Sequence, residues 1–387
     1  MKERILCNAR IVLENEVISG SLALRGQRIQ AIDSGPASTR RSDRTDCAGE
    51  YLIPGLIDVH TDHIERQFAP RNGVYWPSGL SAAMASDALL CGCGVATVLD
   101  SLCAEAFPTE EAKRRMFNDC IQAVSEGERL GLFRSRHLLH LRCETADPKA
   151  SDILQPHLDN PLVQMVSLMD HTPGQRQYRD AQKFREYYAG QGWTDEEFAE
   201  VCARLKRLQA MHAADQRAHI IRQCRQRGVR LASHDDADES HVRQAQEEGV
   251  AISEFPTTLT AAKAAHAAGM DVVMGAPNIV LGGSHAGNVS ALEVFRAGLL
   301  DVLSSDYTPA SLLLAPFQLH AEEEKPLPEC VALVTANPAR MLGLTDRGRL
   351  SEGLLADVLR VRLVETRPII TQVFVNGAPV LAPRGAG

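Results

Sequence analysis

The sequence has no run of about 18 apolar residues, the length that a membrane-spanning helix needs. Its start also lacks the apolar core of a signal peptide, so we expect a cytoplasmic protein. Positive charge is not in excess: the net charge of -8 argues against a general nucleic-acid binder. The ten cysteines are not densely spaced, which argues against a disulfide-stapled secreted domain and favours reduced thiols.

The length of 387 residues suits one full barrel with a smaller second domain. Short alternating stretches, divided by turn residues, fill both ends of the chain, and Asn376-Gly377 is typical of a two-residue hairpin turn. We predict that residues 1–52 and 343–387 together form one small β-sandwich-like domain. Residues 53–342 are predicted to form the other domain.

Eight apolar strand candidates alternate with helical stretches in this central part, as is typical of a parallel α/β fold. They are LIPGLIDVH, GVATVLDS, HLLHLRCE, LVQMVSLMDH, RLASHD, VAISEF, MDVVMGAP and DVLSSDY. Because eight is the strand number of a (β/α)8 TIM-type barrel, we predict that fold. The long helical stretch at residues 195–228 is predicted to be a helical pair or an insertion.

Residues of the kinds that bind metals stand at the ends of several of these apolar runs. They are His60, Asp62, Glu144, His171, His234 and Asp306. A barrel places its catalytic groups at the carboxyl ends of its strands, so this pattern predicts a metal-dependent hydrolase. The H-x-D spacing of His60 and Asp62 lets both side chains point to one face of a strand, toward one ion.

Each residue has its own chemistry and an ordinary structural alternative. Imidazole nitrogens suit Zn2+ or a similar ion, although a lone histidine is often a core residue. Glu144 can bridge two cations or pair with an arginine. Asp306 can bind an ion and act as the catalytic general base, or cap a helix, and His60 with Asp62 can form a buried hydrogen-bonded pair. Six independent ordinary explanations are jointly improbable, so we expect one clustered site.

Basic and polar side chains near these strand ends predict contacts with phosphate groups. The candidates are Arg66, Arg71, Arg142, Gln175, Arg176, Tyr178, Arg179, Lys263 and His285. The alternative for the loop at residues 175–179 is solvated surface, and for the glycine-rich segment around His285 it is an ordinary turn. For Lys263, a position facing solvent is favoured.

Several motifs of this chain resemble the amidohydrolase superfamily. They are PGLIDVHTD, HLRCE, LMDHTPGQRQYRD, ASHDD, SEFPTT, MGAPN, GGSHAGNVSA, LSSDY and VTANPAR. The resemblance covers essentially the whole barrel and the flanking β segments. PGLIDVH and ANPAR mark only the superfamily, whereas HTPGQRQYRD, SEFPTT and GGSHAGNVS together resemble a subgroup of diphosphatases that act on a ribose triphosphate in phosphonate breakdown.

The resemblance implies hydrolysis of a sugar triphosphate that leaves the 5-phosphate and releases diphosphate. It also implies that His60, Asp62 and Asp306 bind one metal ion. His171 and His234 would hold a second ion, and Glu144 would bridge the two. Most superfamily members carry H-x-H on the first strand and many use a carboxylated lysine as the bridge, positions at which this chain has Asp62 and Glu144.

The expected cofactors are two divalent metal ions, Zn2+ in the first place, with Mn2+ or Fe2+ as alternatives. The expected partner is a small phosphorylated sugar, with no nucleic acid and no membrane, and self-association of the chain is left open. Two rival functions remain: hydrolysis of a cyclic amide or an aminated heterocycle by the same chemistry, and a non-catalytic metal-binding paralogue.

Overall fold

The computed structural model describes residues 3–35, 44–71, 73–284 and 286–382. The chain divides into two compact units. The first comprises Met1–Leu99, Glu126–His137 and Val302–Gly387, and the second comprises Asp100–Ser125 and Leu138–Asp301. None of the helices in the described ranges combines the length and the hydropathy of a membrane-spanning segment.

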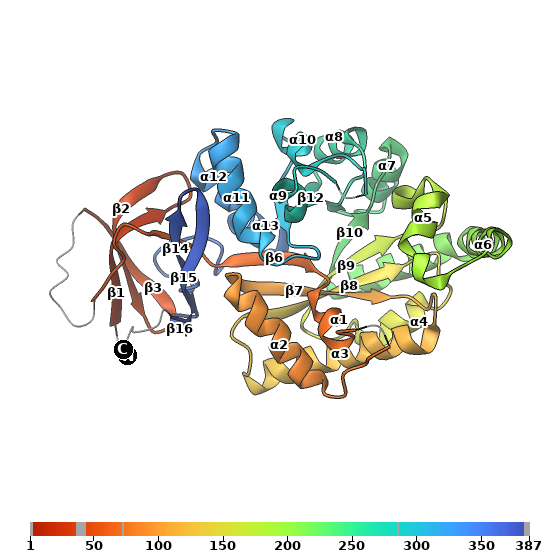
Figure 1. Cartoon of the computed structure of the whole chain (residues 1–387), viewed down its shortest axis with the longest axis horizontal. Helices are drawn as coiled ribbons and strands as arrows, with labels where there is room; N and C mark the ends of the chain where they lie inside the picture. The colour runs from red at the N-terminus through yellow and green to blue at the C-terminus, as the bar shows by residue number, and fades with distance from the viewer. Residues whose placement is uncertain (1–2, 36–43, 72, 285, 383–387) are drawn as a thin grey trace. The chain divides into compact units, whose positions relative to one another are not determined.

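Both ends of the chain contribute to one eight-stranded mixed sheet, which belongs to the first unit (Figure 1). The strand order is β16-β15-β14-β5-β1-β2-β3, with β4 beside β1. The strands are β1 (Glu3–Val12), β2 (Val17–Arg25), β3 (Arg28–Ser34), β4 (Arg44–Asp46), β5 (Tyr51–Pro54), β14 (Val358–Val364), β15 (Arg367–Val375) and β16 (Ala378–Leu381). The predicted hairpin turn joins β15 to β16, and Asn376 and Gly377 take the positive φ angles of 49° and 73° that this turn type requires.

The core of this sheet explains why the two ends fold together. Leu6, Ile11 and Leu22 from the N-terminal strands pack with Val358 and Phe374 from the C-terminal strands in one buried cluster. Burial of this shared cluster removes apolar surface of both ends from water, which favours their folding into one sheet.

A second sheet contains eight strands in the order β6-β7-β8-β9-β10-β11-β12-β13, which confirms the predicted (β/α)8 barrel. The strands are β6 (Leu56–Thr61), β7 (Val95–Ala104), β8 (Arg136–Glu144), β9 (Val163–Met169), β10 (Arg230–His234), β11 (Ile252–Glu254), β12 (Asp271–Gly275) and β13 (Val302–Ser304). Each of them coincides with one of the eight predicted apolar runs. These strands are buried on both faces, as the nearly continuous burial of β7 shows, because helices cover a parallel sheet.

The barrel closes between its first and last strands, both of which belong to the first unit. Thr61 and Asp306 form a parallel bridge there. The N–H of Asp306 donates to the carbonyl oxygen of His60, and the N–H of Asp62 donates to the carbonyl oxygen of Asp306, both over 2.9 Å. The closure therefore lies at the same strand ends that carry three of the predicted metal ligands.

Thirteen α-helices connect and cover the strands in the described part of the chain, and Ser, Thr or Asp side chains cap the starts of α2, α5, α6, α7, α8 and α10. Their bounds are α1 (His63–Phe68), α2 (Gly79–Gly92), α3 (Glu110–Leu130), α4 (Ala150–Leu154), α5 (Ala181–Tyr187), α6 (Asp195–Arg227), α7 (Glu239–Glu247), α8 (Leu259–Ala267), α9 (Ala276–Val280), α10 (Ala291–Arg296), α11 (Ser311–Glu322), α12 (Leu327–Ala332) and α13 (Ala336–Leu342).

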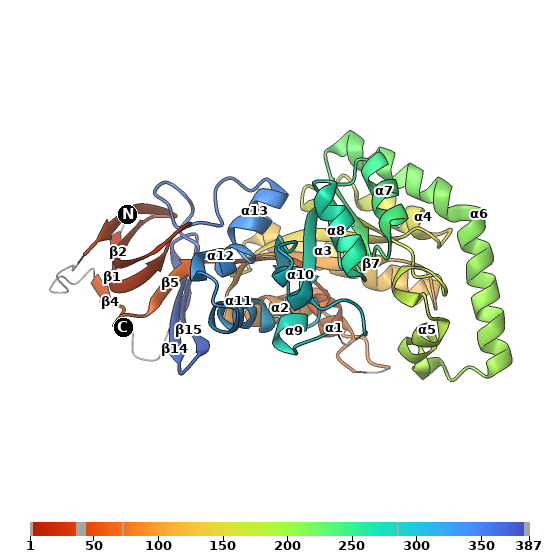
Figure 2. The ribbon, with the colours of Figure 1, turned by 90° about the horizontal axis from the view of Figure 1, so that it is seen from above.

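The longest helix, α6, is part of an insertion between β9 and β10 in the second unit (Figure 2). It is one continuous helix of 33 residues rather than a helical pair. Thr194 and Glu197 form a capping box at its start, and Gly228 ends it with a φ of 67°. The segment between β9 and α6, which includes α5 and the predicted phosphate-binding loop, therefore lies beside the carboxyl end of the fourth barrel strand.

Candidate metal centre

Three predicted ligands come together at the closure of the barrel in the first unit. His60 is on β6, Asp62 follows β6, and Asp306 lies two residues beyond β13. Each of the three offers a ligand atom within 4.8 Å of the others. The Nε2 atom of His60 lies 3.4 Å from Oδ1 of Asp62. We call these three residues the His60 group.

The backbone at Asp306 sets this arrangement. Its φ of 54° lies in the left-handed region, which Asp tolerates better than most residues do. Hydrogen bonds to the backbone of His60 and Asp62 hold this turn on both sides. The alternative of a helix cap is not realised, because α11 starts after Ala310.

A buried carboxylate forms hydrogen bonds next to the His60 group. Asp58 is fully buried on β6, and its Oδ1 accepts the N–H of Ser305 over 3.0 Å and that of His60 over 3.4 Å. Burial raises the pKa of Asp58 to about 6, although the hydrogen bonds from Ser305 and His60 oppose this effect. Asp58 therefore links the first barrel strand to the residue that follows the last one, and it contacts the backbone of the predicted ligand His60.

A second set of ligand atoms lies in the second unit. His171 follows β9 by two residues, His234 ends β10, and Asp235 comes next. Oδ2 of Asp235 lies 3.5 Å from Nε2 of His171 and 3.4 Å from Nε2 of His234. We call these three residues the His171 group, whose ligand atoms all lie within 4.8 Å of one another.

Glu144, at the end of β8, contacts the other side of the His171 ring. Its Oε2 lies 2.9 Å from Nδ1 of His171, and both of its oxygens accept the backbone N–H of His171 over 3.2 Å. The ring edge of Tyr178 also packs on His171, with 5.7 Å between the ring centroids. These contacts fix the ring with its Nε2 atom directed at Asp235.

The electrostatics of the His171 group are those of a site that attracts cations. Burial lowers the pKa of His171, but the carboxylates of Asp235 and Glu144 outweigh it and raise that pKa to about 10. Burial opposes ionisation of Asp235, yet the neighbouring His234, His171 and Arg142 hold its pKa below the usual range. The carboxylates that stabilise the proton on His171 would also stabilise a divalent cation bound there.

The donor atoms fit a divalent metal ion. Ligands held about 2.1 Å from a tetrahedral ion are separated by about 3.4 Å, which matches the spacings from Asp235 and within the His60 pair. Oδ2 of Asp235 is buried, lies 3.4 and 3.5 Å from the two imidazole nitrogens, and has no contact of hydrogen-bond geometry among the described residues. An ion would satisfy this oxygen, and a set of imidazoles and carboxylates suits Zn2+, Mn2+ or Fe2+.

The predicted phosphate-binding residues occupy different environments. Arg66 is exposed and donates to the carbonyl oxygen of Tyr307 over 3.5 Å, next to Asp306 in the first unit. Arg142 is half-buried in the second unit, with a guanidinium nitrogen 3.4 Å from Nε2 of His234. The remaining candidates differ in exposure: Arg71, Arg179 and Lys263 are exposed, Gln175 is half-buried, Arg176 and Tyr178 are buried, and His285 lies outside the described residues.

Arg176 already has partners within the protein. Its guanidinium contacts the carboxylate of Asp236 and donates to the carbonyl oxygen of His234 over 2.8 Å. Both charged side chains are buried, at 5% and 0% exposure. The pair ties the loop after β9 to the end of β10, so Arg176 holds the backbone that carries His234.

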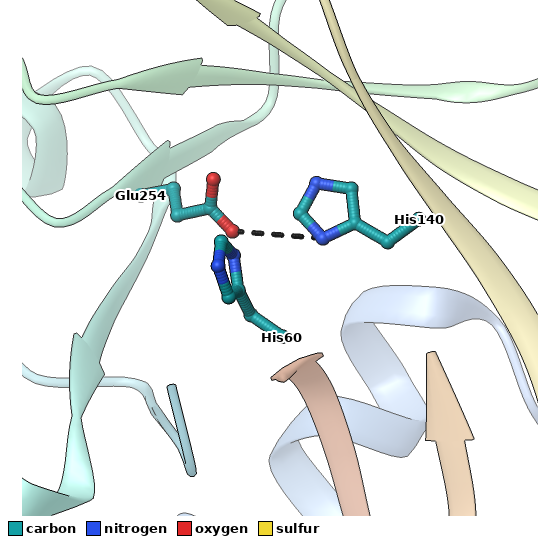
Figure 3. Close-up of side chains that lie close together, drawn as sticks. All are labelled: His60, His140 and Glu254. Atoms are coloured by element: carbon teal, nitrogen blue, oxygen red, sulfur yellow. Dashed lines mark ion pairs between the residues drawn. The ribbon is translucent and has the colours of Figure 1, made fainter. Parts of the chain in front are cut away.

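Three polar residues of this region were not predicted from the sequence: Asp235, Glu254 and His140. Strand alternation places Asp235 on the face opposite to His234, but its φ of 57° turns the chain and breaks that alternation. Glu254 ends β11 as the predicted ligands end their strands, and His140 shares a strand face with Glu144, so both had a usable signal. Figure 3 shows Glu254 and His140 facing each other, with 3.9 Å between Oε1 and Nδ1.

Comparison with known proteins agrees with this fold. Residues 185–368 match the Amidohydrolase family. The chain is 41% identical over 379 residues to the alpha-D-ribose 1-methylphosphonate 5-triphosphate diphosphatase of Escherichia coli (strain K12), which covers 97% of this chain and 100% of that protein.

Solved structures share the architecture at lower sequence identity. N-isopropylammelide isopropylaminohydrolase from Burkholderia multivorans ATCC 17616 has a TM-score of 0.66 at 15% identity, covering 99% of each chain. The 5-methylcytosine deaminase from Klebsiella pneumoniae has a TM-score of 0.64 at 14% identity, covering 99% of this chain and 98% of its own. These two structural similarities show the fold alone, whereas the 41% identity to the full-length relative shows the family. The chain therefore belongs to the amidohydrolase family, as a homologue of the Escherichia coli diphosphatase.

Proposed function

We propose that this chain is a metal-dependent hydrolase that cleaves alpha-D-ribose 1-methylphosphonate 5-triphosphate into the 5-phosphate and diphosphate. The observation that carries the proposal is the 41% identity to the Escherichia coli diphosphatase over 97% of the chain. The two groups of metal-type donors support the metal dependence. We also propose that the reaction takes place in the cytoplasm, which suits ten cysteines that no disulfide joins.

Each group of donors is assigned one divalent ion. His60, Asp62 and Asp306 would hold the first, with Zn2+ as the first expectation. His171 and His234 would hold the second, together with Asp235, which strand alternation would place on the opposite face. Such ions, when bound, supply Lewis-acid stabilisation of the charge on the attacked phosphoryl group. Glu144 keeps His171 oriented through Nδ1, and its bridging of the two ions stays a prediction.

The protein's own residues supply positioning, charge and proton transfer, which is what phosphoryl transfer requires. Asp306 is assigned as the general base that accepts the proton of the attacking water, because its carboxylate lies among donor atoms at a strand end. Arg66 and Arg142 are assigned to phosphate oxygens, since a guanidinium binds them in a bidentate manner and each lies beside one group of ligands. Arg176 is assigned to the support of the loop instead.

Release of diphosphate from the ribose triphosphate, followed by 31P NMR, tests this function together with metal analysis. Asp306→Asn keeps the left-handed backbone that Asn also tolerates, and should lower kcat by about 10²–10⁴-fold while ions remain bound. The matched control is Asp33→Asn on the exposed surface of β3, which should leave turnover unchanged.

Each negative outcome has a separate meaning. Near-normal turnover of Asp306→Asn with bound ions would refute the general base. A wild-type protein with bound ions that releases no diphosphate would refute the proposed reaction. Turnover of cyclic amides or aminated heterocycles in the same panel would replace it with the first rival, and inertness toward every substrate would leave the non-catalytic paralogue.

A further inference from the structure

A chain of hydrogen bonds crosses the barrel interior of the second unit. It takes one polar side chain from each of five neighbouring strands, and we call it the polar belt. Its members are Ser101 on β7, His140 on β8, Ser167 on β9, His234 on β10 and Glu254 on β11. All five are buried, with exposures between 0% and 4%. Barrel interiors are usually filled by branched apolar side chains, so a polar layer here needs a reason.

The distances between the belt members are those of hydrogen bonds. Oγ of Ser101 lies 3.0 Å from Nδ1 of His140, whose Nε2 lies 2.6 Å from Oγ of Ser167. Ser167 in turn donates to Oε2 of Glu254 over 2.8 Å. The same Oε2 atom lies 2.6 Å from Nδ1 of His234. Glu254 is thus the point at which the two arms of the belt meet.

With Glu254 ionised and His140 neutral, the donor and acceptor roles of all five members follow from their chemistry. An ionised carboxylate only accepts, so Ser167 uses its single hydroxyl proton on Glu254 and must accept from Nε2 of His140. His140 in its neutral form then has a bare Nδ1, which accepts the hydroxyl proton of Ser101. On the other arm, Glu254 must accept a proton from Nδ1 of His234. All protons therefore point toward Glu254.

A separate contact agrees with this tautomer of His234. A guanidinium only donates, and a guanidinium nitrogen of Arg142 lies 3.4 Å from Nε2 of His234. A lone pair on Nε2, as in the Nδ1-protonated tautomer, would accept this contact. Nε2 also lies 3.4 Å from Oδ2 of Asp235 in the His171 group, and a divalent cation bound by both atoms would satisfy them together.

We propose that Glu254 is a positioning residue that fixes the orientation and the Nδ1-protonated tautomer of His234, so that Nε2 is ready for a divalent cation. The inference rests on the metal site of the proposed function and is independent of the substrate. A carboxylate that holds the remote nitrogen of a histidine ligand raises the basicity of that ligand and limits its rotation. Ser167 adds a second hydrogen bond to the same oxygen of Glu254.

The first test needs no variant. The 15N chemical shifts of the histidine rings in the metal-free, full-length protein distinguish the two neutral tautomers, with His234→Gln used to assign the signals. We expect His234 to carry its proton on Nδ1. A proton on Nε2 instead would overturn the proposal directly, whatever the stability of any variant.

The second test measures affinity for Zn2+ alone, by calorimetric titration of the metal-free protein. Glu254→Gln keeps the size of the side chain and removes its charge, and it should weaken Zn2+ binding by about 10–100-fold. Ser167→Ala removes a neighbouring hydrogen bond but leaves the one between Glu254 and His234, so it should weaken Zn2+ binding by less than about threefold. This matched control separates the specific contact from general damage to the belt.

The outcomes distinguish a positioning role from a merely structural one. If Glu254 had only a structural role, Glu254→Gln would have a lower Tm but a Zn2+ affinity within about threefold of the wild type. That result would refute the proposal. Equal losses in Glu254→Gln and Ser167→Ala would refute it as well. Neither measurement involves a substrate, so failure of the diphosphatase reaction would leave this result unaffected.

Discussion

Two adjacent aspartates offer the sharpest test of the site, because they are both buried and face different partners. Asp236 contacts the guanidinium of Arg176 and accepts the hydroxyl proton of Ser233 over 2.7 Å. Asp235 instead directs Oδ2 at the imidazoles of the His171 group. We predict that substitution of each by Asn separates protein stability from metal binding.

The expected loss of stability in Asp236→Asn follows from the buried charge that it leaves behind. Removing one partner of a buried ion pair costs about 3–5 kcal/mol. An unfolding entropy of about 2.1 cal/mol/K per residue amounts to about 0.8 kcal/mol/K for 387 residues. The Tm should therefore fall by about 4–6 °C, toward the lower figure because Arg176 retains its bond to the carbonyl oxygen of His234.

Asp235→Asn should act mainly on metal binding. It removes one of the two carboxylates that raise the pKa of His171, but Glu144 remains in contact with that ring, so the Tm of the metal-free protein should fall by less than in Asp236→Asn. The affinity for Zn2+ should fall by at least about tenfold. Scanning calorimetry of the metal-free proteins and Zn2+ titration provide the two readouts. A large loss of Tm in Asp235→Asn with unchanged Zn2+ affinity would refute the assignment of the two residues.

Three further predictions concern pH, the mixed sheet and metal removal. Burial opposes ionisation of Asp87 on α2, but hydrogen bonds and charges from residues 134–137 hold its pKa below normal. The ionised carboxylate therefore stabilises the folded protein above the unfolded pKa of about 3.9, and this stabilisation is lost as the pH falls through the pKa of the folded state. Asp87→Asn should therefore flatten the decrease of Tm below about pH 5. Glu50→Gln removes the carboxylate that Arg360 and Arg362 share, and should lower the urea midpoint by an amount that corresponds to about 2 kcal/mol with unchanged turnover per folded molecule. Dialysis against a chelator should abolish hydrolysis, and because an ion must displace the proton held by His171, whose pKa is about 10, Zn2+ affinity should rise between pH 6 and 8.

The barrel was predictable from the sequence because parallel strands buried on both faces leave a local signal. All eight apolar runs became strands, and the residues at the ends of β6 and β13 could be recognised by position alone. Each run is continuous within the sequence, so it could be recognised without knowledge of its neighbours in the sheet.

The details of the site depend on features that a local pattern does not carry. Asp235 takes a positive φ, which reverses the face that strand alternation assigns to it. The pairing of Arg176 with Asp236 joins residues 60 positions apart, so an arginine in a polar loop could not be told from one that binds phosphate. Glu254, by contrast, stood at the end of a predicted strand and could have been included with the same rule.

The antiparallel pairing of β5 with β14 cannot form until almost the whole chain has been synthesised. Leu52 and Ile53 pair with residues that leave the ribosome about 300 residues later, which at roughly 5–20 residues per second is a delay of about 15–60 s. During that time the edge of β5 has no partner and can pair with another nascent chain. The yield of folded protein should therefore depend on the rate of synthesis and on the density of ribosomes along the message.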